Sequence, residues 1–150
     1  MFRVLNSKNR LQIYLEEILL IDHSKERPSI FLGKGYETFD MYHGNFEITD
    51  ELEERIALRD WRVKENLPED VIVVFGRDSS TVEVTLYFLE GRMNLKLKSN
   101  DPEANRFWIR IKAEPGEHIY GCGEQFSELD LRGRKVPLWV SEQGVGRNKR

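Results

Sequence analysis

Residues 81–98 are TVEVTLYFLEGRMNLKLK, and this stretch decides the fold class. Apolar and polar side chains alternate in both halves, so each half has one apolar face. The apolar positions are Val82, Val84, Leu86, Phe88, Met93, Leu95 and Leu97. Glu90-Gly91 separates the halves, and a glycine-containing pair between two alternating runs is typical of a hairpin turn. The stretch therefore predicts two antiparallel strands that bury one face and expose the other.

Strand-like segments recur along the rest of the chain. Residues 106–112 (RFWIRIK) alternate in the same way, and residues 71–75 (VIVVF) form the continuous β-branched run expected of a buried strand. Residues 51–66 fit a helix at their start, but we favour a strand over about 55–64. Strand starts about 11–14 residues apart, separated by polar turns, predict an all-β antiparallel sandwich. The other predicted segments are one long strand over 11–21, a brief strand over 29–32 that Gly33 and Gly35 stop, and a strand over 45–49.

Length and composition are those of one folded domain. A chain of 150 residues buries about 70% of its unfolded surface, and 16 aromatic residues supply material for a core. Cys122 is the only cysteine, which excludes an internal disulfide and favours a reducing compartment. The N-terminal residues lack the apolar run of a signal peptide, and no stretch approaches 18 apolar residues. We therefore expect a cytoplasmic protein with no membrane partner.

Charge is distributed unevenly along the chain. The net charge is −3, which argues against a nucleic-acid partner. Residues 132–150 carry six basic residues and one acid, a net charge of +5, and the remainder carries −8. This basic segment is either a solvated tail or part of a site for an anionic ligand.

The residue types that usually carry catalysis show no decisive pattern. Gly121 and Gly123 lack the third glycine and the Lys-Ser/Thr pair of nucleotide loops. The three histidines are scattered and have no metal-ligand spacing, so we expect no metal and no cofactor. Four carboxylates near the C-terminus are candidates for acid–base chemistry, but ordinary surface carboxylates fit the same pattern. They are Glu124, Glu128, Asp130 and Glu142.

The C-terminal segment nevertheless resembles a known family. Residues 118–126 (HIYGCGEQF), 130–133 (DLRG) and 137–150 (PLWVSEQGVGRNKR) are similar to the end of the N-terminal β-sandwich in glycoside hydrolase family 31. The likeness is greatest to the sulfoquinovosidase branch of that family. In the stretch 118–126, residues 120–124 match the family's Tyr-Gly-x-Gly-Glu pattern. Weaker similarity at residues 40–46, 54–58 and 105–110 extends the resemblance over most of the chain.

The resemblance implies a fold, an activity and a partner. It implies that residues 1–150 form a galactose-mutarotase-like sandwich, or most of one, that precedes a catalytic (β/α)₈ barrel absent from this chain. The family hydrolyses α-glycosides with retention, and both catalytic carboxylates belong to the barrel. We therefore expect no catalytic residue here and no activity from this segment alone, although the full-length protein would be a glycoside hydrolase. Alternatives are an α-glucosidase or α-xylosidase of the same family, a scaffold, or a carbohydrate-binding sandwich that uses Trp61, Trp108 or Trp139.

The resemblance also implies which residues approach a substrate. Loops of the sandwich reach the mouth of the barrel site in this family, where sugar hydroxyls favour carboxylate or amide partners and a sulfonate favours guanidinium. The same positions could instead brace the interface between sandwich and barrel. The candidate residues are Glu124, Gln125, Arg132, Gln143 and Arg147.

Overall fold

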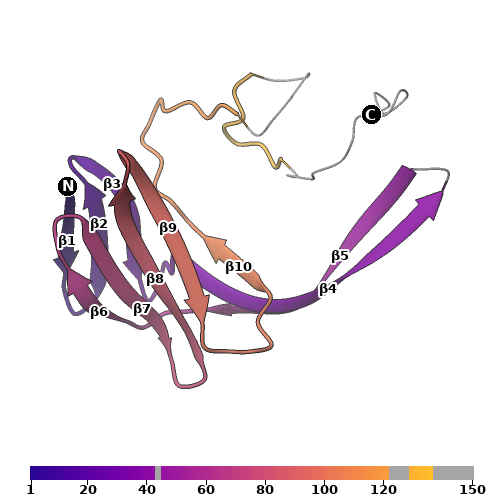
Figure 1. Cartoon of the computed structure of the whole chain (residues 1–150), viewed down its shortest axis with the longest axis horizontal. Helices are drawn as coiled ribbons and strands as arrows, with labels where there is room; N and C mark the ends of the chain where they lie inside the picture. The colour runs from indigo at the N-terminus through magenta and orange to yellow at the C-terminus, as the bar shows by residue number, and fades with distance from the viewer. Residues whose placement is uncertain (43–44, 122–128, 137–150) are drawn as a thin grey trace. The chain divides into compact units, whose positions relative to one another are not determined.

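The hairpin predicted at residues 81–98 is present in the computed structural model, which describes residues 1–42, 45–121 and 129–136 (Figure 1). β8 (Ser80–Leu89) pairs antiparallel with β9 (Arg92–Ser99), and Val84 lies opposite Leu97. Both turn residues, Glu90 and Gly91, have positive φ (51° and 73°), as a two-residue type I′ turn requires. β7 (Asp70–Arg77) and β6 (Trp61–Asn66) complete a four-stranded sheet in the order β6-β7-β8-β9.

The N-terminal sheet corrects the prediction of one long strand over residues 11–21. That segment is a hairpin of β2 (Arg10–Leu15) and β3 (Ile18–Ser24), and β1 (Phe2–Asn6) pairs with β2. The turn between β2 and β3 is Glu16-Glu17, with Glu16 at φ 54°. Because no glycine, proline or asparagine marks this turn, the sequence pattern did not reveal it.

The third sheet has the order β10-β4-β5 and contains the longest strands, β4 (Ile30–Tyr42) and β5 (Asn45–Ala57). The prediction that Gly33 stops a brief strand was wrong, because β4 runs through both glycines. Gly33 lies under the Trp108 ring of β10 (Arg106–Ile109), where a Cβ atom would come within 2.8 Å of that ring. The strand predicted over about 55–64 was also wrong: β5 ends at Ala57 and β6 begins at Trp61.

The core lies between the four-stranded sheet and the two three-stranded sheets. One cluster of buried side chains draws on all three sheets, and Phe75 is its largest fully buried member. His23 is also fully buried, with its ring edge-on to Phe75 (4.8 Å between centroids) and Trp61 (5.1 Å). The predicted all-β antiparallel sandwich is therefore confirmed, and no described segment is a helix able to cross a membrane. The other buried members of the cluster are Phe2, Leu11, Ile13, Ile21, Ile30, Leu32, Leu58, Val71, Val73, Val82, Val84 and Leu86.

The distal half of the β4–β5 hairpin has little cover. From Tyr36 to Tyr42 every residue of β4 is exposed, whereas five of the six residues before Tyr36 are buried. We call residues 36–42 and 45–52 the arm. Figure 1 shows these parts of β4 and β5 continuing away from the strands that enclose the core.

The chain divides into two compact units, Met1–Ala113, which holds all of these strands, and Glu114–Arg150. The described part of the second unit forms turns rather than strands. Leu131 is buried, and its N–H donates to the Ile119 carbonyl at 2.8 Å.

Candidate functional site

Four of the five predicted substrate-binding residues, Glu124, Gln125, Gln143 and Arg147, lie outside the described residues. The fifth, Arg132, belongs to the second unit and is exposed. Its Nη1 donates to the Glu114 carbonyl at 2.8 Å and also to the Glu117 carbonyl. Arg132 therefore ties two turns of its own unit together. Both the predicted contact with substrate and the alternative of a brace between sandwich and barrel stay predictions.

Asp130 accepts three hydrogen bonds within the described part of the second unit. Its Oδ2 accepts a hydrogen bond from His118 Nδ1 at 2.7 Å, and its Oδ1 accepts the backbone N–H groups of Arg132 (3.0 Å) and Ile119 (3.1 Å). The His118 hydrogen bond, followed by the two backbone N–H groups, lowers the pKa of Asp130 to about 2. A general acid needs a pKa near or above the working pH, so Asp130 is unsuited to that role.

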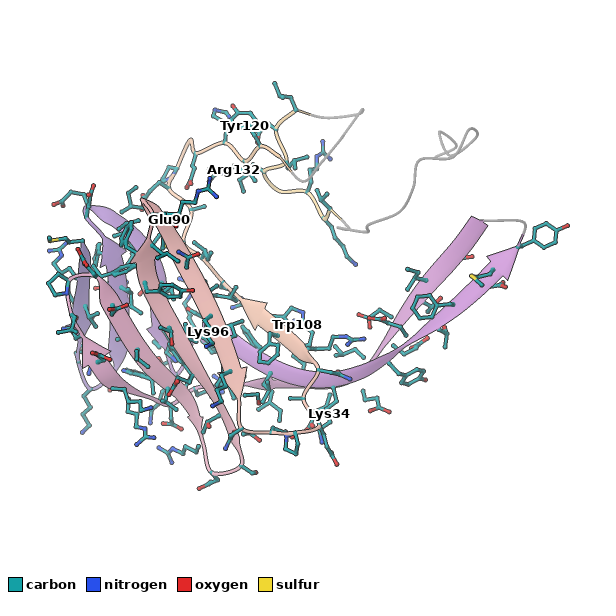
Figure 2. The ribbon with its side chains drawn as sticks, in the orientation of Figure 1. Lys34, Glu90, Lys96, Trp108, Tyr120 and Arg132 are labelled. Carbon is teal, nitrogen blue, oxygen red and sulfur yellow. The ribbon has the colours of Figure 1, made fainter. Side chains whose placement is uncertain are left out.

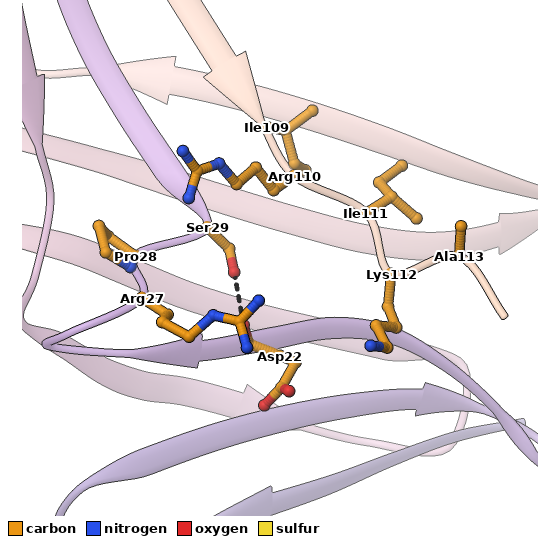
Figure 3. Close-up of a pocket in the computed structure, with 9 residues that line it drawn as sticks. All are labelled: Asp22, Arg27, Pro28, Ser29, Ile109, Arg110, Ile111, Lys112 and Ala113. Atoms are coloured by element: carbon orange, nitrogen blue, oxygen red, sulfur yellow. Dashed lines mark hydrogen bonds between the residues drawn. The ribbon is translucent and has the colours of Figure 1, made fainter. Parts of the chain in front are cut away.

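A basic pocket lies in the first unit, where the chain leaves β10 (Figure 3). It encloses about 430 Å³. Arg27, Arg110 and Lys112 supply three cations, while Asp22, the one acid in the lining, is held by Arg10 through bonds of 2.6 and 2.8 Å. The Arg10 hydrogen bond lowers the pKa of Asp22, which stays ionised. The pocket offers positive charge to an anion but no acid–base pair for catalysis.

This pocket was not predicted from the sequence. Its cations come from the turn after β3 and from the end of β10, which lie more than 80 positions apart, so no local motif joins them. The fold brings them together: the Arg110 N–H donates to the Ser29 carbonyl and the Lys112 N–H to the Leu20 carbonyl, both at 2.8 Å. The one indication of the pocket in the sequence was the set of basic residues Arg106, Arg110 and Lys112 within the alternating run 106–112.

The tryptophans are poorly placed to act as a sugar platform. Trp61 is half-buried, and its Nε1 donates to Asn6 Oδ1 at 2.9 Å. Trp108 is half-buried against Gly33, and the Arg55 guanidinium lies 4.7 Å from its ring centroid. Trp139 lies outside the described residues. Among the residues that are described, no cluster of three or more potential ligands could hold a metal ion.

Comparisons with known proteins agree on one family. Residues 6–149 match the model of the glycosyl hydrolase 31 N-terminal galactose mutarotase-like domain. The chain is 42% identical to a sulfoquinovosidase of Escherichia coli over 99% of its own length and 22% of that protein. It is 39% identical to a sulfoquinovosidase of Agrobacterium fabrum over 95% of its own length and 21% of that protein.

Solved structures give the same result. A GH31 family sulfoquinovosidase from E. rectale, in complex with the aza-sugar inhibitor IFGSQ, superposes with a TM-score of 0.78 at 39% identity. The superposition covers 97% of this chain and 21% of the other. The chain therefore spans about a fifth of the length of the curated relatives it matches.

Proposed function

Because the chain belongs to glycosyl hydrolase family 31, as its N-terminal galactose mutarotase-like domain, we propose that it is the non-catalytic part of a retaining α-glycosidase acting on α-sulfoquinovosides. One observation carries this proposal. Both curated relatives that match almost the whole chain are sulfoquinovosidases, and the chain corresponds to only about a fifth of each. A catalytic (β/α)₈ barrel in the same polypeptide is the proposed partner.

The chemistry of a retaining glycosidase sets a requirement that Asp130 does not meet. Retaining hydrolysis uses a nucleophilic carboxylate and a second carboxyl group, about 5–5.5 Å apart, that first donates and then accepts a proton. Asp130 is fixed as an anion by three hydrogen bonds, so it cannot donate the proton. We therefore assign both catalytic carboxylates to the barrel and predict that the 150-residue chain alone is inactive.

We propose that the C-terminal segment lines the entrance to the barrel site through Glu124, Gln125, Arg132, Gln143 and Arg147. The net charge of +5 over residues 132–150 supports a role near an anionic sugar. In the longer polypeptide, Arg147→Ala should lower kcat/KM for a sulfonated substrate about tenfold or more and leave the glucoside value nearly unchanged. Lys149→Ala is the matched control. Equal losses on both substrates would make Arg147 a brace.

Two alternatives predict different results: the first differs in substrate preference and the second in sugar binding by the isolated chain. An α-glucosidase or α-xylosidase of the same family would show no preference for the sulfonate group. A free-standing carbohydrate-binding sandwich would bind sugars without a barrel, but the positions of Trp61 and Trp108 argue against it. Titration of the chain with millimolar sugar, followed by tryptophan fluorescence, tests that alternative. A saturable change would support it.

The proposal is tested on the longer polypeptide with an α-sulfoquinovoside, by following the anomeric protons of the released sugar by NMR. A retaining enzyme releases the α-anomer first, and the 150-residue chain at equal concentration should release none. Initial release of the β-anomer would contradict retention, and turnover by the short chain would contradict a non-catalytic role. We also propose a cytoplasmic location, on the single cysteine, which cell fractionation would check.

A further inference from the structure

The basic pocket where the chain leaves β10 carries positive charge that the described residues do not neutralise. Arg27, Arg110 and Lys112 line it, and none of the three makes an ion pair with a described residue. Asp22, the one acid in the lining, is already bonded to Arg10. Because Asp22 and Arg10 neutralise each other, the three lining cations stay uncompensated, and the pocket favours an anionic ligand.

Backbone hydrogen bonds hold the segments that carry these cations. The N–H groups of Arg110 and Lys112 each donate to a carbonyl within residues 20–29, at 2.8 Å. The Arg27 N–H donates to Ser24 Oγ at 3.0 Å, and the Arg27 carbonyl accepts from the Ser24 N–H at 3.2 Å. Figure 3 shows the Arg27 and Lys112 side chains extending into the pocket from these two segments. Cations on a held backbone lose less freedom when an anion binds, so the pocket is partly pre-organised.

Asp22 gives the pocket a second chemical feature, which is spare capacity to accept hydrogen bonds. The two oxygens of a carboxylate offer about four acceptor sites, and Arg10 Nε and Nη2 take two of them, at 2.6 and 2.8 Å. The Arg10 hydrogen bond is the largest cause that lowers the pKa of Asp22, and the charges of Lys112 and Arg27 lower it further, so both cations lie near the carboxylate. The Asp22 side chain is 24% exposed. Its remaining acceptor sites can therefore bind hydroxyl groups of a ligand whose anionic group the cations hold.

The volume of the pocket indicates the size of that ligand. At about 430 Å³ it lies in the lower part of the roughly 300–1,000 Å³ range of small-molecule sites. Pro28, Ile109, Ile111 and Ala113 supply apolar lining beside the charged groups. Ile111 is 55% exposed, so the pocket opens to solvent. A single sugar ring suits these dimensions, whereas a bare inorganic anion would leave both the apolar lining and the Asp22 acceptor sites unused.

We propose that the basic pocket binds a polyhydroxylated anion the size of a monosaccharide, such as a sugar acid, a sugar phosphate or a sugar sulfonate. Arg27 and Lys112 hold the anionic group, and Asp22 accepts hydroxyl groups of the ring. Arg110, whose guanidinium lies 4.8 Å from the Phe31 ring centroid, adds positive charge from the wall of the pocket. The inference concerns binding by the first unit and does not depend on the proposed activity.

Isothermal titration calorimetry of the 150-residue chain tests this inference, with glucuronate and the phosphate and sulfonate derivatives of glucose at its sixth carbon as probes. We expect a Kd of about 0.1–1 mM for at least one probe, the weak range of an open site for a small ligand, and weaker binding in high salt. Glucose lacks the anionic group and inorganic phosphate lacks the hydroxyl groups, so each should bind at least tenfold more weakly. The order of the three probes shows which anionic group the pocket prefers.

Variants locate the binding. Arg27→Gln with Lys112→Gln should weaken it at least tenfold. Lys149→Gln with Arg150→Gln removes the same charge from the basic C-terminal segment and should leave it unchanged. A second control, Lys96→Gln with Lys98→Gln, lies on β9, which contributes no residue to this pocket (Figure 2).

Two further measurements make the result decisive. NMR shift changes on titration should map to Ile109, Ile111 and Ala113, and circular dichroism checks that every variant folds. The same titration of the longer polypeptide should give a similar Kd. Three results would overturn the inference: no binding of any probe at millimolar concentration, an equal loss in either control variant, or inorganic phosphate or glucose binding as tightly as the probes. Loss of binding in the longer polypeptide would also overturn it, because another part of that polypeptide would then occupy the pocket.

Discussion

A methyl group added at Gly33 should destabilise the sandwich, because the backbone of β5 and the Trp108 ring of β10 already occupy the space beside that position. A Cβ atom there would lie 2.3 Å from the Glu54 carbonyl oxygen and 2.8 and 3.0 Å from carbon atoms of the Trp108 ring. The ring can tilt, but the carbonyl belongs to the backbone of β5 and cannot move without opening the β4–β5 ladder. Gly33→Ala therefore forces overpacking that side-chain rotation alone cannot relieve.

The magnitude follows from three contributions. Overpacking of a filled site costs about 1–3 kcal/mol. Tilting Trp108 weakens the Arg55 stacking by about 0.5–1 kcal/mol. Alanine restricts the unfolded chain and returns about 0.4–1 kcal/mol. The net loss is roughly 2 kcal/mol, out of about 5–15 kcal/mol for a domain of this kind.

Urea unfolding followed by circular dichroism measures this change. With a slope of about 2 kcal/mol per M, the midpoint for Gly33→Ala should fall by about 1 M. Introducing Trp108→Leu into both backgrounds tests the mechanism, because the alanine should cost less once the ring is absent. A Gly33→Ala midpoint within about 0.2 M of the parent would refute the argument.

Three further outcomes are expected. Phe75→Leu removes a fully buried ring that packs edge-on against His23. It should lower the free energy of unfolding by about 1–2 kcal/mol. A thermal or urea midpoint equal to that of the parent would contradict this packing. Burial lowers the pKa of His23 below its ordinary value of 6.5. As the pH falls below 6.5, the unfolded chain therefore binds a proton at His23 more readily than the folded chain does. The free energy of unfolding should decrease over that range. His23→Phe should flatten that slope in urea titrations, and an unchanged slope would exclude His23 as its source. The Asp130 carboxyl carbon should titrate near pH 2 by NMR, so its hydrogen bonds support the local structure above about pH 3.8 and are lost as pH falls through 2; a midpoint near 3.8 would show that the His118 contact does not form in solution.

The sequence predicted the fold best where alternation and turn chemistry coincide. The hairpin at 81–98 has both, with Gly91 at the position of positive φ. The β2–β3 turn has neither glycine nor proline, so two strands looked like one. Gly33 was taken for a strand end, because a tryptophan 75 positions away that requires a bare backbone leaves no local trace.

The candidate site was less predictable than the fold. The stretches 118–126, 130–133 and 137–150 indicated the family, but they gave no indication that Asp130 is fixed by His118 and two backbone N–H groups. The basic pocket could not be predicted from the sequence, for a related reason. Its cations meet only after the segment that follows β10 has bonded through its backbone to Ser29 and Leu20. Clusters of this kind depend on tertiary contacts, which sequence spacing does not encode.

We propose that this chain is part of a sulfoquinovosidase. The most direct test is the ratio of kcat/KM for an α-sulfoquinovoside to that for the matching α-glucoside, measured on the purified longer polypeptide with the 150-residue chain as a parallel sample. We expect a ratio of at least about 100 for the longer polypeptide, equivalent to about 2.7 kcal/mol of transition-state discrimination, and no turnover by the short chain. A ratio near or below 1, or hydrolysis by the short chain, would contradict it.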